Sequence, residues 1–179
     1  MKKLSMDQLN RVSVSEFQDE AKFPLVLILD DIRSMNNVGS LFRTADAFAV
    51  EHLYLCGITA QPPHKEIHKT ALGATESVSW SYEKSVVDLV KRLKEEQYMV
   101  YIVEQTDTPL YLNYFEPEKN KKIAIILGNE VFGVNDALLP IVDGALEIPQ
   151  YGTKHSLNVT IAGGVVIWSL IQKMERQTV

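Results

Sequence analysis

Polar residues that can hold a ligand directly follow two short apolar segments in the last third of the chain. Residues 123–127 run into Gly128-Asn129-Glu130, and residues 145–148 run into residues 149–152, which include a proline, a glutamine and a glycine. A glycine at such a place lets a ligand approach the backbone, because no Cβ stands in the way. Open α/β sheets bind their ligands at the carboxyl ends of strands. We therefore expect a ligand site where these two segments end.

Strand-like and helix-like segments alternate along the chain and must position these residues. Short apolar runs, which predict buried strands, occupy residues 25–29, 52–56, 78–80, 98–103, 123–127 and 145–148. Helices are expected at residues 36–48, 64–72, 83–97 and 157–173. This alternation predicts an α/β fold, a mostly parallel sheet covered by helices. No strand precedes a Gly-x-Gly-x-x-Gly pattern, which argues against a Rossmann dinucleotide site.

Capping patterns indicate where two parts of the chain begin. Ser5-x-x-Gln8 and Ser15-x-x-Gln18 both fit a capping box, so residues 1–23 are expected to form a short helical extension. Pro24 then opens the first buried strand, and we expect the main domain to comprise residues 24–179. Asn37 or Asn36 is expected to cap the helix that follows this strand.

The composition limits the class of protein. A chain of 179 residues, of which 46% are hydrophobic, predicts one packed domain. The single cysteine, Cys56, excludes an internal disulfide and a multi-cysteine zinc site, and it fits a reducing cytosol. The first ten residues lack the apolar region of a signal peptide. The longest apolar run, residues 161–171, is about half the ~20 residues of a membrane span. We expect a cytoplasmic protein that does not enter a membrane.

The charge restricts where a nucleic acid could bind. The net charge is −5, whereas nucleic-acid binders usually carry a basic surface, so any such surface must be local. It requires that the fold gather basic residues on one face, from among Arg33, Arg43, His64, Lys65, His68, Lys69, Lys121, Lys122, Lys154 and His155. His64 and His68 stand four residues apart, a spacing that can also bind a metal. No third ligand is evident in the sequence, and we expect no metal site.

Three motifs carry a resemblance to a known family. The first is Asn37-x-Gly39-x-x-x-Arg43-Thr44-Ala45, and the second is Leu127-Gly128-Asn129-Glu130 with Gly133. The third is Ile148-Pro149-Gln150-x-Gly152-x-x-x-Ser156-Leu157-Asn158-Val159. In this order they resemble the motifs of the SpoU/TrmH family, which are S-adenosylmethionine-dependent RNA ribose 2′-O-methyltransferases of the SPOUT superfamily. The resemblance covers residues 25–173.

The resemblance implies a fold, a cofactor and partners. In this family the last strand, loop and helix thread into a deep C-terminal trefoil knot. S-adenosylmethionine binds in the loops of the knot, and two subunits pair to complete each active site. The chain is thus expected to be an enzyme that acts as a homodimer on RNA. Many relatives carry a further RNA-binding domain ahead of the catalytic one, where we expect only the short extension here.

The resemblance also assigns catalytic roles. Arg43 corresponds to the family's proposed catalytic arginine. A guanidinium stays protonated in ordinary surroundings, so we prefer a role in which Arg43 grips the substrate phosphate and orients the hydroxyl. Asn37 would hold Arg43 or the ribose, and Glu130 would orient Asn37, Arg43 or a loop. Ser156 and Asn158 would line the methyl-transfer pocket, and Asn158 could also contact the cofactor.

Each of these residues has a simpler interpretation that does not use the resemblance. Arg43 would be a surface arginine paired with Asp46 or Asp30. Glu130 would be an acidic residue at a helix N-terminus, where the helix dipole favours it. Ser156 and Asn158 would cap the final helix.

Cofactor binding in this family relies largely on backbone groups of the knot loops. The positions of this chain that match are Gly128, Ile148, Leu157, Asn158 and, at the end of an earlier strand, Glu104. Ile148 and Leu157 would also enclose the adenine from both sides. Without the resemblance, these two are ordinary core residues.

Departures from the commoner family pattern bear on the substrate. Val131-Phe132 replaces a polar or glycine pair, and Gln150 stands where many bacterial relatives have methionine. Gln150, Trp168 and residues 103–106 look closer to eukaryotic-type tRNA guanosine ribose methyltransferases. This favours tRNA, with a D-loop guanosine as the candidate, over ribosomal RNA. Two other classes stay open: a non-catalytic RNA-binding or assembly factor of the same fold, and a nucleotide- or small-molecule-binding α/β protein, which the acidic charge suggests.

Overall fold

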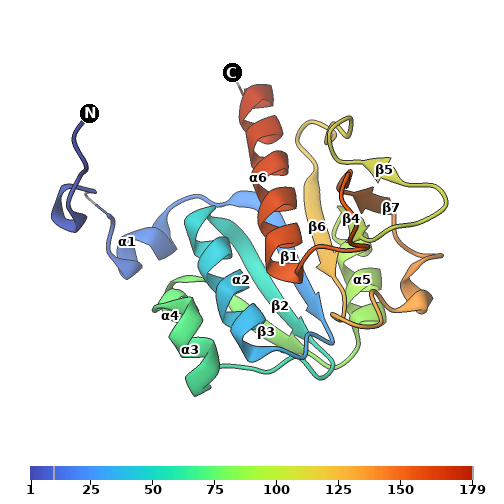
Figure 1. The fold of residues 1–179 in the computed structure, drawn as a ribbon, viewed down its shortest axis with the longest axis horizontal. Coiled ribbons are helices and arrows are strands. Elements are labelled where there is room, and N and C mark those ends of the chain that lie inside the picture. Colours follow the sequence, from blue (N-terminus) through green and yellow to red (C-terminus); the bar gives the residue numbers. More distant parts are fainter. Residues whose placement is uncertain (10, 179) are drawn as a thin grey trace.

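One seven-stranded sheet forms the centre of the computed structural model, which describes residues 1–9 and 11–178. The strands are β1 (Phe23–Asp30), β2 (Val50–Cys56), β3 (Trp80–Glu83), β4 (Tyr98–Val103), β5 (Leu110–Tyr111), β6 (Lys122–Leu127) and β7 (Gly144–Glu147). They lie in the order β3-β2-β1-β6-β4-β7-β5, and every pairing is parallel (Figure 1). The predicted α/β fold with a mostly parallel sheet is confirmed.

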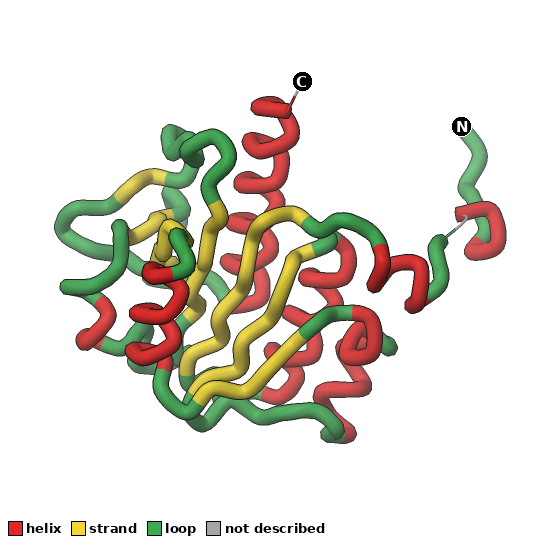
Figure 2. The backbone as a smooth tube through the Cα atoms, turned by 180° about the vertical axis from the view of Figure 1, so that it is seen from behind, coloured by secondary structure: helices red, strands yellow, loops and turns green. Residues whose placement is uncertain are grey.

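Helices cover both faces of this sheet. In chain order, the helices of the described residues are η1 (Met6–Leu9), α1 (Val14–Asp19), α2 (Met35–Ala47), α3 (Lys65–Ala71), α4 (Ala74–Ser77), α5 (Val86–Glu95), η2 (Asp136–Leu138) and α6 (Val159–Thr178), of which η1 and α1 lie to the side of the sheet (Figure 1). The side chains of β1 alternate between two hydrophobic clusters. Leu25, Leu27 and Leu29 pack with residues of α2, α3 and α6, whereas Val26 and Ile28 pack with α5. Figure 2 shows α5 in front of the sheet and the other large helices behind it.

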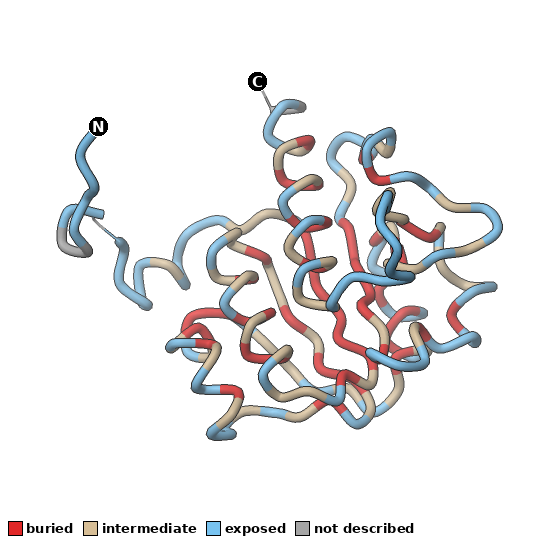
Figure 3. The backbone as a smooth tube through the Cα atoms, in the orientation of Figure 1, coloured by how far each residue is buried: buried red, intermediate tan, exposed pale blue. Residues whose placement is uncertain are grey.

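The apolar runs of the sequence form the buried centre of the molecule. β1 and β6 lie in the middle of the sheet and are buried over most of their length, whereas the N-terminal segment before β1 is exposed (Figure 3). This segment contacts the main body through Gln18, whose Nε2 donates a hydrogen bond of 2.8 Å to the carbonyl oxygen of Glu76. Within the described residues, no helix combines the length and hydropathy of a membrane span.

Two predicted helix caps are wrong. Ser34 caps α2, because its Oγ accepts the N–H of Asn37 at 3.3 Å, so Asn36 and Asn37 lie in the first turn instead. In the N-terminal segment the complete capping box uses Ser13 and Glu16 rather than Ser15 and Gln18. Of the box predicted for Ser5 and Gln8, one half is present, since the Oε1 of Gln8 accepts the N–H of Ser5 at 3.0 Å.

Several element boundaries also differ from the prediction. β3 begins at Trp80 rather than at residue 78, because Val78 ends α4 and donates its N–H to the carbonyl oxygen of Ala74 at 3.1 Å. The helix expected at residues 83–97 is shorter, at Val86–Glu95, because the Oγ of Ser85 caps it. Residues 107–120, where the sequence analysis assigns no strand or helix, contain the short edge strand β5.

The last helix returns across the sheet. After β7 the chain passes through residues 148–158, and α6 then packs beside α2 over the middle of the sheet (Figure 1). Gly163 allows this close approach, because a Cβ there would lie 2.8 Å from the side chains of Leu127 and Leu41. Further along α6, the Nζ of Lys173 donates a hydrogen bond of 2.8 Å to the carbonyl oxygen of Leu112. This returning section is the one for which the resemblance predicts a knot.

Candidate active site

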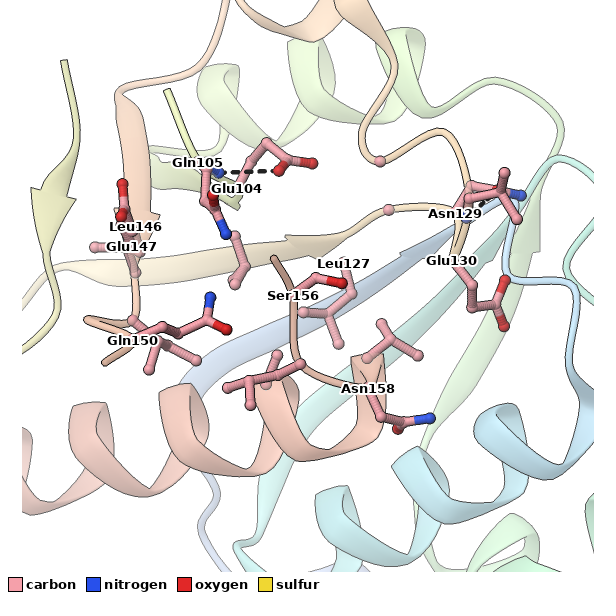
Figure 4. A pocket seen from close by; sticks show the side chains of 18 residues that line it. Glu104, Gln105, Leu127, Asn129, Glu130, Leu146, Glu147, Gln150, Ser156 and Asn158 are labelled. Atoms are coloured by element: carbon pink, nitrogen blue, oxygen red, sulfur yellow. Dashed lines mark hydrogen bonds between the residues drawn. The ribbon is translucent and has the colours of Figure 1, made fainter. Parts of the chain in front are cut away.

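A cavity of about 450 Å³ opens at the carboxyl ends of β4, β6 and β7, beside the start of α6. The residues proposed to bind the cofactor all line it: Glu104, Gly128, Ile148, Leu157 and Asn158. Glu130 and Ser156 line it as well. Glu130 and Asn158 lie at the end that faces α2, whereas Glu104, Gln105, Glu147 and Gln150 lie at the other end (Figure 4).

A tight loop after β6 forms one wall of this cavity. The N–H of Asn129 donates to the carbonyl oxygen of Gly133 at 2.9 Å, and the N–H of Gly133 donates back at 3.0 Å. The Asn129 side chain accepts the N–H of Val131 at 2.9 Å and donates to the carbonyl oxygen of Asp31 at 2.7 Å. A Cβ on Gly128 would lie 2.4 Å from the backbone of Gly133. The loop therefore requires glycine at residue 128 and is fastened to the end of β1.

Glu130 connects this loop to the start of α2. Its Oε2 accepts the N–H of Arg33 at 2.9 Å, and its Oε1 accepts the N–H of Ser34 at 3.0 Å and the Nδ2 of Asn37 at 2.9 Å. Partial burial raises the pKa of Glu130, but these hydrogen bonds together outweigh it and hold the pKa below the ordinary value. The carboxylate thus stays ionised at neutral pH and fixes the Asn37 side chain.

Asn158 begins the final helix, as the simpler interpretation expects. Its Oδ1 accepts the N–H of Thr160 at 2.8 Å and the Thr160 hydroxyl at 2.6 Å. Since the cap uses only Oδ1, the Nδ2 group is available to donate to a ligand. The loop before Asn158 is held by Gln105, whose Nε2 donates to the carbonyl oxygen of His155 at 2.6 Å. Ser156 is exposed and makes no side-chain hydrogen bond within the described residues.

The cavity has the chemistry of a site for a cationic, partly apolar small molecule. Three carboxylates, those of Glu104, Glu130 and Glu147, line it, and none of its described lining residues is basic. Opposite charges attract most strongly where water is partly excluded. Ile148 and Leu157 supply apolar surface between these carboxylates. The volume lies within the roughly 300–1,000 Å³ of typical small-molecule sites.

Glu104 also has a structural role at this site. Its Oε1 accepts the N–H of Gln105 at 2.9 Å, and its Oε2 accepts the N–H of Val134 at 3.3 Å. It therefore joins the loop after β4 to the loop after β6. A Cβ on Gly133 would lie 2.4 Å from Oε2 of Glu104, so the second glycine of the loop makes room for this carboxylate.

Arg43 does not line this cavity. It follows Asn37 by six residues on α2, which places the two side chains about 120° apart around the helix axis. Arg43 is exposed and lines a second cavity, of about 460 Å³, between α2 and α3. Within the described residues it pairs with neither Asp46, which accepts the Ser77 hydroxyl, nor the buried Asp30. The proposed catalytic residues thus form two separate groups in the folded chain.

The sequence matches one family model over most of its length. Residues 24–168 match the model described as the SpoU rRNA Methylase family. The chain belongs to the SpoU rRNA methylase family. It is therefore a SpoU-type RNA 2′-O-methyltransferase. The C-terminal knot is implied by membership of this family.

Relatives within this family modify different RNAs. A tRNA (guanosine(18)-2′-O)-methyltransferase of Aquifex aeolicus is 27% identical over 166 residues, which cover 90% of this chain and 75% of that enzyme. A 23S rRNA (guanosine(2553)-2′-O)-methyltransferase of Bacillus subtilis is 32% identical over 146 residues. This second match covers 81% of this chain and 57% of that enzyme. The chain thus spans three quarters of one relative and little more than half of the other.

Solved structures share the fold. The S-adenosylmethionine-bound rRNA methyltransferase of Sinorhizobium meliloti superposes with a TM-score of 0.76 at 23% sequence identity. The superposition covers 86% of this chain and 58% of that protein. At this level of identity the likeness establishes the fold alone.

The sequence analysis assigns no role to two residues whose side chains hold the loops around the cavity. Asn129 is part of the second motif, but the sequence does not indicate that its side chain fastens the loop to Asp31. Gln105 stands next to Glu104, and its bond to His155 joins segments that are 50 residues apart. A turn-forming Asn-x-x-x-Gly spacing could have indicated the first; nothing in the sequence indicates the second.

Proposed function

We propose that this protein transfers a methyl group from S-adenosylmethionine to a ribose 2′-hydroxyl of tRNA, with a D-loop guanosine as the candidate nucleotide. The observation that carries this proposal is the Glu130–Asn37 hydrogen bond, which joins the first family motif to the cavity formed by the second and third. Residues 24–179 would form the catalytic domain, and residues 1–23 a short extension. A cytoplasmic location agrees with the single, buried cysteine.

The lining of the first cavity supports S-adenosylmethionine as the cofactor. When bound, S-adenosylmethionine supplies an electrophilic methyl group on a positively charged sulfonium. The three carboxylates of the lining suit this charge, and Ile148 and Leu157 suit the two faces of the adenine. Backbone groups of Gly128, Ile148 and Leu157, with Asn158 and Glu104, would hold the molecule. Two solved proteins that share this fold, the rRNA methyltransferase of Sinorhizobium meliloti and AviRb of Streptomyces viridochromogenes, contain bound S-adenosylmethionine, which supports the same cofactor here.

The residues around the cavity would position the nucleophile. A ribose hydroxyl reacts poorly unless it is oriented, and positioning can supply much of the acceleration in a two-substrate step. Asn37, fixed by Glu130, would hold the ribose. Ser156 and the Nδ2 of Asn158 would line the side from which the hydroxyl approaches. Arg43 would grip the neighbouring phosphate, and the hydroxyl proton would leave with help from that phosphate.

In a homodimer, Arg43 of one copy would complete the active site formed by the cofactor cavity of the other copy. In a single subunit, Arg43 lies on a different cavity from Glu130 and Asn158. Phe48 lines the Arg43 cavity and contacts Trp168 on α6, with ring centroids 5.8 Å apart. Trp168 belongs to an apolar face of α6 with Ile161 and Val165, and these three are 53%, 55% and 38% exposed. A second copy that covers this face would lie beside Arg43.

The choice of tRNA rests on residues rather than on the relatives. The two relatives described above act on tRNA and on rRNA at similar identity, so they do not discriminate. Gln150, which lines the cofactor cavity, and Trp168, on the exposed face of α6, resemble the tRNA-specific group. We therefore place tRNA ahead of ribosomal RNA.

The test is methyl transfer from labelled S-adenosylmethionine into separate pools of unmodified tRNA and unmodified ribosomal RNA. We expect label in the tRNA pool. Label only in ribosomal RNA would support the proposed reaction but would contradict tRNA as the substrate. If neither pool is labelled and the protein does not bind S-adenosylmethionine, the proposed methyltransferase activity would be contradicted. A non-catalytic RNA-binding factor would then be favoured.

A further inference from the structure

The cavity that Arg43 lines contains a second basic side chain. Arg43 on α2 and Lys69 on α3 both line this hollow of about 460 Å³. Both side chains are exposed, and neither makes a hydrogen bond or an ion pair within the described residues. Two cations that face one hollow without a counter-charge repel each other, so an anion bound between them would be stabilised.

The packing of α3 on α2 holds these two cations side by side. Gly39 lets the helices touch, because a Cβ there would lie 2.3 Å from the carbonyl oxygen of Ile67. Thr70, next to Lys69, donates its hydroxyl to the carbonyl oxygen of Asn36 at 3.0 Å. The helix positions that carry Lys69 and Arg43 are thus fixed relative to each other by the packing of α3 on α2.

The hydroxyl groups that line the cavity already donate their hydrogen bonds to backbone carbonyl oxygens. Ser40 donates its hydroxyl to the carbonyl oxygen of Asn36 at 2.8 Å, and Thr44 donates to that of Ser40 at 3.0 Å. Thr70 is engaged with the same carbonyl of Asn36. The hydrogen-bond donors that remain for an anion therefore belong to Arg43 and Lys69.

The surface around this cavity is rich in basic residues, although the protein as a whole is acidic. α3 adds Lys65 and His68 to the same helix, and both are exposed. The acidic groups nearby are Asp46, which accepts the Ser77 hydroxyl, and Glu66 in the first turn of α3. The fold thus brings Arg43 of α2 beside the basic residues of α3, in a chain whose net charge is −5.

We propose that Lys69 is a second phosphate-binding residue of the RNA site and that it acts together with Arg43 on adjacent phosphates of the substrate strand. This inference rests on the proposed function and extends it to a residue outside the three motifs. A strand held at both residues would run across α2 and α3 toward the methyl-transfer cavity. Lys69 would position the strand and would not touch the reacting atoms.

The test compares Lys69→Met with Lys91→Met. Lys91 is an exposed lysine on α5, on the opposite face of the sheet, and serves as the matched control. The probes are unmodified tRNA and unmodified ribosomal RNA, and affinity is measured over a range of salt concentrations. We expect Lys69→Met to weaken binding about five- to tenfold and to reduce the slope of log affinity against log salt by roughly 0.7–1, the value for one phosphate contact. Lys69→Arg should restore both quantities, and Lys91→Met should leave both unchanged.

The outcomes separate this inference from the proposed function. Wild-type protein that binds RNA while Lys69→Met retains the same affinity and salt slope would overturn the role of Lys69 alone. An equal loss in Lys91→Met would also overturn it, because the effect would then reflect net charge. Wild-type protein that binds neither RNA would overturn the proposed function and this inference together. S-adenosylmethionine binding, which Lys69→Met should not alter, checks that the variant is folded.

Discussion

The Nδ2 of Asn37 lies 2.9 Å from the Oε1 of Glu130, and this contact joins residues that are 93 positions apart. The same carboxylate accepts two backbone N–H groups that precede α2, from Arg33 and Ser34. Three donors therefore determine where the carboxylate lies, and the carboxylate in turn determines the orientation of the Asn37 amide. A single chain thereby connects the first and second motifs without involving Arg43.

Replacing Glu130 by glutamine should reduce turnover more than cofactor binding. An amide offers one acceptor oxygen in place of two, so at least one of the three donors loses its partner. We expect kcat to fall by up to about 10²-fold, because Asn37 is no longer held in one orientation. Steady-state kinetics with Glu95→Gln, an exposed glutamate on α5, as the control would check this. Equal turnover in the two variants would rule out the orienting role.

Stability should decrease as the pH rises through the titration of Asp30. Burial raises the pKa of Asp30 from 3.8 to about 6, the charge of Asp31 adds to the effect, and the N–H of Asn135 opposes it. Between the unfolded pKa of 3.8 and the folded pKa of about 6, the folded protein binds a proton at Asp30 that the unfolded chain lacks. The stabilisation from this proton is therefore complete below pH 3.8 and is lost as the pH rises toward 6.

Asp30→Asn removes this proton exchange and keeps an acceptor for the N–H of Asn135. Near neutral pH we expect the Tm of the variant to exceed that of the wild type by at least about 2 °C. The difference should shrink as the pH falls toward 4. Melting curves over this pH range are the measurement, and two parallel profiles would contradict the raised pKa.

The strand ends were the most predictable part of the site. Glu104 and Gly128 follow apolar runs, Ile148 ends one, and the structure brings all three to one cavity. The cap at Ser34 was not predictable, because Asn36 and Asn37 are equally good capping residues and only tertiary contacts decide among them. The bond of Asn37 to Glu130 is one such contact.

The sequence also does not predict that Arg43 lies apart from the cofactor cavity. Helical spacing gives the angle between Asn37 and Arg43, but it does not say what each face of α2 contacts. The partner of the Arg43 face is α3, and Gly39 permits its approach. A motif glycine identifies a close contact without naming the segment that makes it.

Gly39→Ala should separate α3 from α2. The added methyl would meet the carbonyl oxygen of Ile67 at 2.3 Å, and backbone cannot move as easily as a side chain. We expect a loss of about 1–3 kcal/mol in the free energy of unfolding. Gly164→Ala is the control, since nothing lies within 4 Å of a Cβ there, and it should gain about 0.5–1 kcal/mol. Denaturant titrations measure both; a neutral Gly39→Ala would mean that the helices do not touch as described.

Trp168→Glu should dissociate the proposed homodimer. A charge placed on the apolar face of α6 would have to be buried against the second copy, and we expect the dimer to weaken by about 2 kcal/mol or more, roughly 30-fold in Kd. Analytical ultracentrifugation would follow the change. Tyr114→Glu, at a residue that is 81% exposed in the loop before β6, provides the comparison. A wild-type protein that is monomeric at all concentrations would remove the basis for a shared site.

The position of the transferred methyl group tests the central claim most directly. RNA labelled by the enzyme would be hydrolysed in alkali, which cleaves only next to a free 2′-hydroxyl. We predict that the label remains in alkali-resistant dinucleotides and that Arg43→Ala lowers its rate of incorporation by about 10²-fold or more. Label recovered in mononucleotides, and therefore on a base, would contradict ribose methylation. Incorporation by Arg43→Ala at the wild-type rate would contradict the role assigned to Arg43.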